Sequence, residues 1–263
     1  MSTSFSPIER PEGHPSVRSV VDGSIGRLTL ADPERRNALR IELSLDLEAA
    51  VTETLAEGAE VLVLDADPPV FCSGGDLDDL VAPRASLADI GRGAAALRAC
   101  PVPTIAMVDG PVIGAGITLA LACDVIVCSS RATFDPRLLD LGVHPGGGQL
   151  RELSRRIGRQ GAVALSLLGD VLTGAESEAR GLVWRCVPIE ELEPTALGWA
   201  ERVVSRPAAA VRRAKATLDA TIDASADDAV RMELDAQQWS MEQEWIGERV
   251  ARLRQRLTRR ERD

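Results

Sequence analysis

The sequence predicts an α/β protein in which strands and helices alternate as far as residue 188 and only helices follow. Two observations support this prediction. Short, continuous apolar runs, such as residues 61–64 and 104–108, have the composition of fully buried strands. Between such runs apolar residues recur at helical spacing, and beyond Pro188 that spacing continues without further strand signals. Alternation followed by an all-helical stretch indicates an α/β core with a helical C-terminal region.

The predicted elements follow in chain order. Residues 1–15 form a polar tail, and residues 16–30 read as a β-hairpin that turns at Asp22-Gly23. Further strands are predicted over 61–64, 104–108, 124–130 and 181–188, and helices over 37–58, 86–99, 114–123, 158–168, 190–218 and 226–258. We therefore expect a flexible tail over 1–15, an α/β core over 16–188 and a helical region over 189–263.

The composition sets limits on the class of protein. Of 263 residues 45% are hydrophobic and 27% are charged, which suits one large core and excludes a disordered or collagen-like chain. The formal net charge of −10 argues against a broad nucleic-acid surface, although a local arginine cluster could still bind a small polyanion.

Cysteine usage and hydropathy predict a cytoplasmic, soluble protein. The five cysteines are odd in number and show no CxxC spacing, which is typical of reduced, buried thiols. The N-terminal segment lacks the apolar region of a signal peptide. The longest uncharged apolar stretch spans residues 111–123, well short of the roughly 20 residues that a membrane helix needs. We expect no membrane association.

Two glycine-rich turns carry the strongest chemical signal. The first, FCSGGDL, covers residues 71–77, and the second, DGPVIGAG, covers residues 109–116 and leads directly into a predicted helix. Backbone N–H groups that lack an intrahelical partner are preorganised donors for an anion. Two of them converging from separate turns would form a minimal oxyanion hole. Such turns are also common as purely structural features, so the residues alone leave both interpretations open.

Other motifs are missing. Gly114-Ala115-Gly116 lacks the third glycine of a dinucleotide fingerprint, and neither GxxxxGK[ST] nor GxSxG occurs. The only histidines are His14 and His144, so a histidine-based metal site is not expected.

Five segments resemble the enoyl-CoA hydratase/isomerase (crotonase) superfamily. They occur in the family's order and spacing, and the resemblance extends from about residue 17 to residue 254. The segments are residues 22–39, 61–77, 101–127, 141–148 and 181–188. The resemblance implies a spiral of ββα repeats with a helical C-terminal trimerisation region, hence a homotrimer or hexamer. It also implies that a coenzyme A thioester is the substrate and that no separate cofactor is needed.

The resemblance assigns roles to individual positions. It implies that the backbone N–H groups of Gly75 and Ala115 stabilise a thioester enolate. Further substrate-binding positions are Ser73, Gly74, Asp76, Gly114, Thr118 and Leu138. It also places Arg35 and Arg36 near the CoA phosphates, whereas Asp78 and Asp79 stand where relatives often carry a lysine and would repel phosphate.

The chain departs from the family pattern at the acid/base positions. The two glutamates of the hydratases correspond to Thr118 and Leu138, and a third carboxylate position corresponds to Gly146. None of these can exchange a proton at neutral pH as a carboxylate does. The alternatives are Asp140, which a strand-like backbone would turn to the same side as Leu138, and His144 beside the glycine-rich turn.

Other interpretations of these residues stay open. Asp140 could be a solvated carboxylate, and the ring nitrogens of His144 could be satisfied by loop backbone. Asp135 could take the acid/base role if the alignment slips by one or two residues. A nucleophilic role for Cys72 or Ser73 with His144 is the weakest alternative, because Cys72 sits among apolar neighbours.

The sequence thus predicts an acyl-CoA-binding enzyme of the enoyl-CoA hydratase/isomerase type that lacks both family glutamates. The alternatives are an acyl-CoA isomerase, hydrolase or decarboxylase, or a non-catalytic acyl-CoA-binding trimer. A fold that now serves only in protein assembly is a third possibility.

Overall fold

The computed structural model describes residues 16–260, and the predicted tail over residues 1–15 lies outside the described residues. The chain divides into two compact units, the first ending at Arg202 and the second beginning at Val203. This division falls inside the helical region predicted over residues 189–263. Each unit is therefore described by itself.

Parallel strands dominate the main sheet of the first unit. The described residues form a six-stranded sheet in the order β1-β2-β3-β4-β6-β9, in which only the β1–β2 pair is antiparallel. The strands are β1 (Val17–Asp22), β2 (Ile25–Leu30), β3 (Val61–Ala66), β4 (Thr104–Val108), β6 (Val125–Ser129) and β9 (Arg185–Val187). The hairpin predicted at Asp22-Gly23 and the buried strands β3, β4 and β6 are confirmed.

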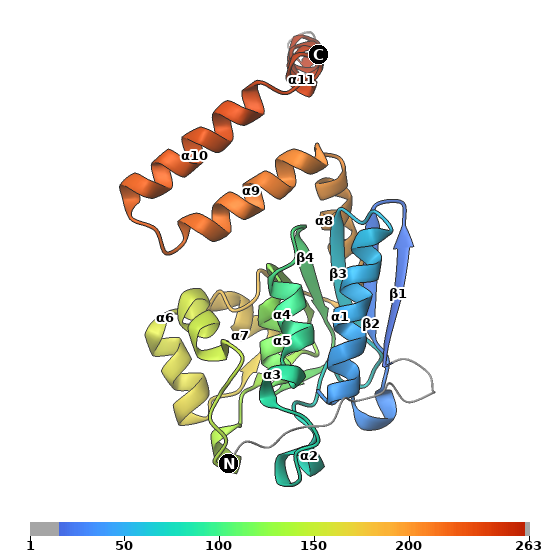
Figure 1. Ribbon diagram of the computed structural model, residues 1–263, viewed down its shortest axis with the longest axis vertical. Coiled ribbons are helices and arrows are strands. Elements are labelled where there is room, and N and C mark those ends of the chain that lie inside the picture. Colours follow the sequence, from blue (N-terminus) through green and yellow to red (C-terminus); the bar gives the residue numbers. More distant parts are fainter. Residues whose placement is uncertain (1–15, 261–263) are drawn as a thin grey trace. The chain divides into compact units, whose positions relative to one another are not determined.

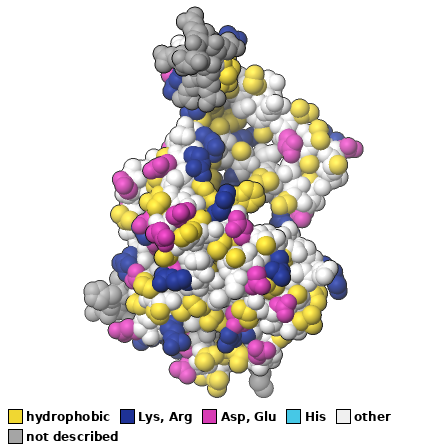
Figure 2. Space-filling model, turned by 180° about the vertical axis from the view of Figure 1, so that it is seen from behind, with side chains coloured by type: hydrophobic (Ala, Val, Ile, Leu, Met, Phe, Trp, Pro, Cys, Tyr) yellow, Lys and Arg dark blue, Asp and Glu magenta, His cyan; other side chains and the backbone are white. Residues whose placement is uncertain are grey.

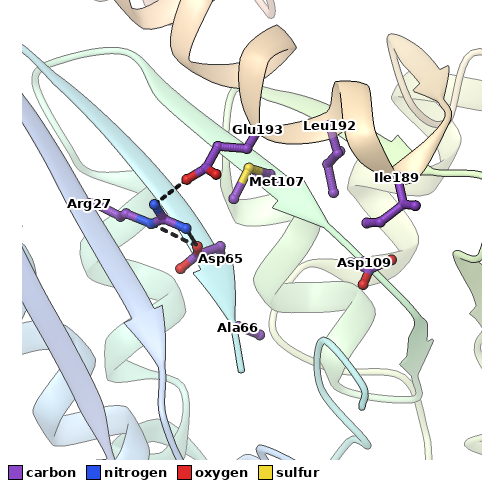
Figure 3. Close-up of a pocket in the computed structure, with 8 residues that line it drawn as sticks. All are labelled: Arg27, Asp65, Ala66, Met107, Asp109, Ile189, Leu192 and Glu193. Carbon is purple, nitrogen blue, oxygen red and sulfur yellow. Dashed lines mark hydrogen bonds and ion pairs between the residues drawn. The ribbon is translucent and has the colours of Figure 1, made fainter. Parts of the chain in front are cut away.

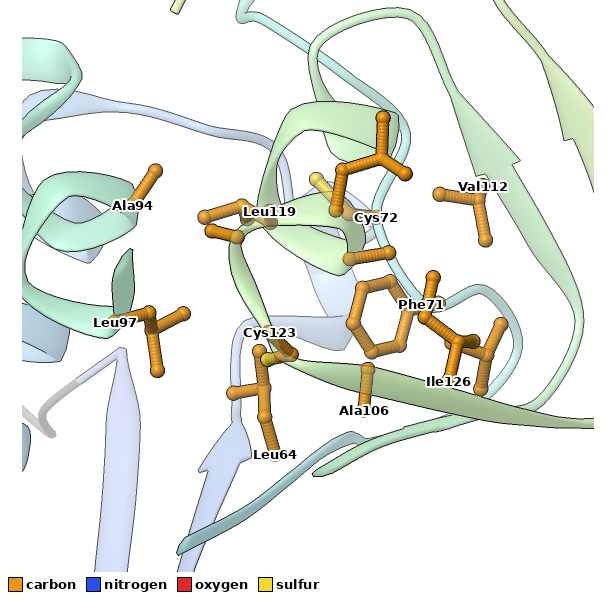
Figure 4. Close-up of a cluster of buried hydrophobic side chains, with 14 of the residues drawn as sticks. Leu64, Phe71, Cys72, Ala94, Leu97, Ala106, Val112, Leu119, Cys123 and Ile126 are labelled. Carbon is orange, nitrogen blue, oxygen red and sulfur yellow. The ribbon is translucent and has the colours of Figure 1, made fainter. Parts of the chain in front are cut away.

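Three helices cover one face of this sheet. They are α1 (Ile41–Ala56), α4 (Arg92–Arg98) and α5 (Gly116–Ala122) (Figure 1). Strand side chains that point toward them, such as Leu64 and Ala106, are fully buried with Leu97 and Leu119 (Figure 4). Because strand side chains alternate between faces, Asp65 points to the opposite face together with Arg27 and Met107 of the adjacent strands, and α8 (Ile189–Val204) packs against this face.

A second, smaller sheet was not expected from the sequence. It contains β5 (Pro111–Ile113), β7 (Thr133–Asp135) and β8 (Leu172–Thr173), in that order. Strands of two or three residues are too short for the alternation of polar and apolar residues to be visible. This sheet matters for function, because β5 lies within the second glycine-rich turn.

Several predicted helices have different bounds, and local chemistry explains each difference. The helix expected over 37–58 begins only at Ile41, because Asn37 has φ of +51° and its side chain donates to the Asp67 and Val70 carbonyls. The helix expected over 86–99 is divided at Gly91 into α3 (Leu87–Ile90) and α4.

The remaining helices of the first unit include two that the periodicity did not indicate, α2 (Leu77–Val81) and α7 (Gly174–Ala179). Helix α6 (Gln149–Leu168) begins earlier than the predicted 158–168 segment, and Gly158 interrupts it with non-helical φ/ψ. The helix predicted over 114–123 begins only at Gly116, since Gly114 has φ of +52°.

The second unit is helical. It contains the end of α8 and the helices α9 (Ala208–Thr221), α10 (Ala226–Met241) and α11 (Trp245–Arg260). Pro207 ends the single helix expected over 190–218, since proline lacks an N–H and disfavours helical φ/ψ at the preceding residue. The rings of Trp239 and Trp245 meet edge to face, with their centroids 6.0 Å apart. The Arg213 guanidinium lies 5.6 Å from the Trp239 ring centroid. No helix in the described residues is long and apolar enough to cross a membrane.

Candidate active site

The first glycine-rich turn is held against the second by backbone hydrogen bonds. The Phe71 N–H donates to the Pro111 carbonyl at 3.1 Å, and the Ile113 N–H donates to the Cys72 carbonyl at 2.9 Å. Cys72 and Val112 form an isolated parallel bridge between the two segments. The two turns, which are separated in sequence by helices α2 to α4 and strand β4, therefore lie side by side.

Residues 36–39 support the first turn from another side. The Ser73 N–H donates to the Arg36 carbonyl at 3.1 Å, and the Leu39 N–H donates to the Gly74 carbonyl at 2.7 Å. Asn37 is fully buried, and its side-chain amide holds the Val70 carbonyl at 2.9 Å. These contacts fix the backbone of the first turn without using any catalytic side chain.

Gly74 lies directly against the second turn. Its φ is +97°, and a Cβ added there would lie 2.9 Å from the Ile113 carbonyl oxygen and 3.5 Å from the Ala115 nitrogen. Only glycine combines this φ with such a close approach. The sequence Ser73-Gly74-Gly75 thus brings the Gly75 N–H into the neighbourhood of the Ala115 N–H.

The peptide between Gly114 and Ala115 is fixed on its carbonyl side. The Gly114 carbonyl accepts hydrogen bonds from the Ile117 N–H at 3.2 Å and from Gln149 Nε2 at 3.3 Å, and the Gly114 N–H donates to the Asp135 carbonyl at 2.8 Å. Within residues 16–260, neither the Ala115 N–H nor the Gly75 N–H donates to a protein acceptor. Both donors are available to a ligand.

Thr118 and Leu138, which the sequence resemblance assigns to the positions of the family glutamates, lie at the second turn. Thr118 is 7% exposed, and a Cβ added at Gly147 would lie 2.8 Å from its Cγ2 methyl. Leu138 is half-buried, with Cδ2 3.4 Å from the position of a Cβ added at Gly114. An apolar side chain and a threonine methyl therefore occupy this side of the second turn.

The structure contradicts the strand-like backbone on which the placement of Asp140 beside Leu138 depends. Residues 139–141 form a short 3-10 helix, so alternation does not place the Asp140 side chain with Leu138, and Asp140 is exposed. His144 is also exposed, with Nδ1 2.8 Å from the Pro145 carbonyl oxygen. Asp135 is buried, but its carboxylate accepts from Arg137 Nε at 2.9 Å. The backbone of Asp135 adjoins the second turn, where its carbonyl accepts from the Gly114 N–H, whereas Asp140 and His144 lie exposed on the loop between β7 and α6.

The Cys72 thiol is buried in the core and is not suited to act as a nucleophile. It is completely buried, and burial raises the pKa of its thiol to about 11, with only partial opposition from the Gly74 and Leu39 N–H groups. A neutral, buried thiol is a poor nucleophile. Its position against Gly116, where an added Cβ would lie 2.6 Å from the Cys72 carbonyl oxygen, indicates a role in joining the turns.

The arginines expected near CoA phosphate lie beside the first turn. Arg35 and Arg36 are both exposed, and Arg35 lies 3.5 Å from an Asp32 oxygen. Asp76 caps α2 by accepting from the Asp78 N–H at 2.9 Å, and its carboxylate lies 3.6 Å from Arg40. Asp76 thus has a local structural role in addition to its position in the turn.

An ion-pair network neutralises part of the acidic segment after the first turn. Arg84 donates to Asp79 at 2.6 Å and to Glu42 at 2.7 Å. The Arg84 hydrogen bond holds the pKa of Asp79 below its usual range. The repulsion of phosphate that the sequence predicts for Asp79 is therefore reduced, whereas Asp78 is exposed.

A cavity of about 230 Å³ lies elsewhere, between α8 and the opposite face of the main sheet (Figure 3). Arg27 bridges Asp65 and Glu193 within it, and Met107 and Leu192 line its apolar side. No residue of the two glycine-rich turns except Asp109 lines this cavity, so it is separate from the candidate active site. On the face seen in Figure 2, acidic and basic side chains are interspersed, with no broad basic patch.

Gln149 is the residue that sequence reasoning missed. The fourth of the five segments that carry the family resemblance ends at residue 148, one position before Gln149. A polar residue directly after three glycines at a helix start gave no periodicity signal. Its significance is visible only in the contact with Gly114.

Comparisons with known proteins identify the family of this chain. The family model described as enoyl-CoA hydratase/isomerase matches residues 21–252. A Mycobacterium tuberculosis protein named as a probable enoyl-CoA hydratase is 34% identical over 252 residues, which cover 90% of this chain and 96% of that protein.

Solved structures show the same fold. An enoyl-CoA hydratase from Polaromonas is 27% identical with a TM-score of 0.85, covering 91% of this chain and 97% of that chain. A Thermobifida fusca protein assigned as an enoyl-CoA hydratase was solved in complex with acetoacetyl-CoA. It is 28% identical with a TM-score of 0.80, and the match covers 86% of this chain and 95% of that chain. The chain has the crotonase fold and belongs to the enoyl-CoA hydratase/isomerase family.

Proposed function

We propose that the chain binds an acyl-CoA thioester and stabilises the enolate form of that thioester with the N–H groups of Gly75 and Ala115. The observation that carries the proposal is the close approach of Gly74 to the second turn, where an added Cβ would lie 3.5 Å from the Ala115 nitrogen. The Gly75 and Ala115 N–H groups at this approach have no protein acceptor in the described chain. Fixed donors aimed at developing charge are the largest contribution to many acyl-transfer and enolisation reactions. The acetoacetyl-CoA complex of the Thermobifida fusca relative supports the choice of substrate class.

The side chains at the second turn favour chemistry other than efficient hydration. Addition of water to an enoyl thioester needs a general base for water and an acid for the α-carbon. Thr118 and Leu138, which lie at the second turn, supply neither. The proposal is therefore an isomerase, hydrolase or decarboxylase type of reaction on an acyl-CoA, in which the polarised thioester is the common step.

Proton transfer, where the reaction needs it, is assigned to Asp140 or His144. These are the carboxyl and imidazole side chains on the loop between β7 and α6. Both are exposed in the chain by itself, so either must approach the thioester as it binds. Arg35 and Arg36, exposed beside the first turn, are assigned to the CoA phosphates.

A non-catalytic acyl-CoA-binding protein is the second candidate. The observation that favours it is again the pair Thr118 and Leu138, because an intact pair of backbone donors would bind and polarise a thioester without transferring a proton. The two candidates differ in whether α-protons of a bound acyl-CoA exchange with solvent.

Calorimetric titration with crotonyl-CoA, followed by absorbance of the enoyl-thioester band, tests the proposal. We expect saturable binding with little loss of the band. Rapid loss of the band would show a hydratase and contradict the assignment of Thr118 and Leu138. No heat of binding with any CoA thioester would contradict acyl-CoA binding itself. Loss of α-proton exchange in His144→Ala or Asp140→Ala would identify the base.

We also propose that the chain assembles as a homotrimer or a hexamer. Helices α9 to α11 expose large apolar side chains, the usual mark of a surface that another subunit covers. They include Leu218, Ile222, Val230, Leu234, Met241, Val250 and Leu253. A monomeric mass in light scattering would refute this assembly. The free thiols fit a reducing compartment such as the cytoplasm.

A further inference from the structure

We propose that Gln149 is a positioning residue of the oxyanion hole: its side-chain amide holds and polarises the Gly114–Ala115 peptide whose N–H would bind the thioester oxygen. This inference rests on the proposed function and adds a residue to it. Gln149 Nε2 lies 3.3 Å from the Gly114 carbonyl oxygen. The carbonyl of Gly114 and the N–H of Ala115 belong to one planar peptide unit, so a donor on the carbonyl fixes the direction of the N–H.

Burial makes this contact informative. Gln149 is 1% exposed, and a carbonyl can only accept, so the amide nitrogen must face Gly114. The other amide atom, Oε1, is buried and has no hydrogen-bond partner among the described residues. A buried polar group that is only partly satisfied is unfavourable for stability. Gln149 therefore lowers the stability of the fold through an Oε1 that no described residue pairs, while its Nε2 binds the second turn at Gly114.

Local geometry explains how Gln149 reaches this place. Gly147 and Gly148 have φ of +63° and +85°, and together they turn the chain into α6, of which Gln149 is the first residue. Gly147 packs against the Thr118 methyl, which leaves no room for a Cβ. The glycines thus allow α6 to begin close under the second turn.

As far as the structure describes the chain, the hydrogen bonds at the Gly114–Ala115 peptide are all made to its carbonyl oxygen, and none is made by its N–H. The Gly114 carbonyl accepts from both the Ile117 N–H and Gln149, while the Ala115 N–H has no acceptor in the part of the chain that the structure describes. Donors on a carbonyl polarise the peptide and strengthen the hydrogen bond that its N–H can make. Removal of the Gln149 amide should therefore weaken polarisation of a bound thioester more than it weakens binding of the CoA moiety.

The test uses butyryl-CoA labelled with ¹³C at the carbonyl as the probe. In the wild-type chain we expect binding to move the carbonyl resonance downfield. In Gln149→Met, which keeps length without a donor, we expect more than half of that displacement to be lost. The α-proton exchange of the wild type, where present, should fall by about tenfold. The dissociation constant should change less than twofold. Gln160→Met, an exposed glutamine on the same helix, is the matched control and should behave as wild type.

The outcomes separate this inference from the proposed function. If a folded Gln149→Met chain still moves the carbonyl resonance of butyryl-CoA as far as the wild type does, the role of Gln149 is overturned and the proposed oxyanion hole is not. Absence of displacement in the wild-type chain overturns the oxyanion hole and this role with it. If Gln149→Met does not fold, Gln149→Asn, which keeps the amide but shortens its reach, takes its place. Loss of displacement at unchanged thermal stability supports the proposal, since a purely structural residue would alter stability first.

Discussion

Replacement of Gly74 by alanine probes the contact between the two glycine-rich turns. Gly74 has φ of +97°, and the new methyl would lie 2.9 Å from the Ile113 carbonyl oxygen and 3.5 Å from the Ala115 nitrogen. Gly58, just beyond the end of α1, has nearly the same φ of +98° but has nothing within 4 Å of an added Cβ. The pair Gly74→Ala and Gly58→Ala therefore separates backbone strain from steric contact.

Backbone strain and steric contact together give the expected loss in the free energy of unfolding for each variant. A non-glycine residue in the left-handed region costs roughly 1–2 kcal/mol, and both variants carry this cost. Only Gly74→Ala adds the cost of an overpacked contact with backbone, about 1–3 kcal/mol. Gly74→Ala should thus lower the free energy of unfolding by about 1–3 kcal/mol more than Gly58→Ala does.

The same methyl should also impair ligand binding. Relief of the 2.9 Å contact requires Ile113 and the adjoining Ala115 N–H to move away from the Gly75 N–H. Such a displacement should weaken binding of an acyl-CoA by about tenfold, because donor positions in an oxyanion hole are tightly constrained. Gly58→Ala should bind as wild type.

Urea denaturation and calorimetric titration with butyryl-CoA measure the two effects. Equal losses of stability in Gly74→Ala and Gly58→Ala would refute the steric argument. Unchanged affinity in Gly74→Ala would refute the claim that this contact sets the distance between the two N–H groups.

Three further predictions concern neighbouring features. Gly147→Ala should lower the free energy of unfolding by about 1–3 kcal/mol more than Gly142→Ala, which carries backbone strain alone. Thr118→Ser, which removes the contacted methyl, should recover part of this additional loss in denaturant titrations. Cys72, with its thiol pKa raised to about 11, should resist alkylation at pH 8 until the chain unfolds, as mass spectrometry would show. Arg84→Gln should cost about 0.2–1 kcal/mol at pH 7, and this difference should shrink below about pH 4 as Asp79 becomes protonated.

Each of these predictions has its own control and contrary result. Gly142→Ala, at φ of +69° in open space, should carry only backbone strain, so an equal loss there would remove the role of the Thr118 methyl. Half-buried Cys186 should be alkylated before Cys72, and the reverse order would contradict the burial argument. For Asp79 the lowered pKa means that its stabilising effect is present above the unfolded value and lost as pH falls. A difference that grows in acid would therefore contradict the Arg84 pairing.

Much of the fold was predictable because its signals are local. The hairpin at Asp22-Gly23 follows from turn chemistry, and β3, β4 and β6 follow from continuous apolar runs, which report burial on both faces. The family resemblance supplied the identity of the two turns. Strands as short as β7 gave no such signal, because fewer than four residues show no period. The start of α6, residues 149–157, was also missed, and Gly158 with its non-helical φ/ψ separates it from the part that was predicted.

The sequence by itself determined the composition of the two glycine-rich turns, and its family resemblance predicts that Thr118 and Leu138 stand where hydratases carry glutamates. Only the tertiary structure decided how these parts meet. The approach of Gly74 to Ala115 and the contact of Gln149 with Gly114 join segments far apart in the chain. Local periodicity carries no information about such contacts, because they arise from the packing of the two sheets and α6 against one another.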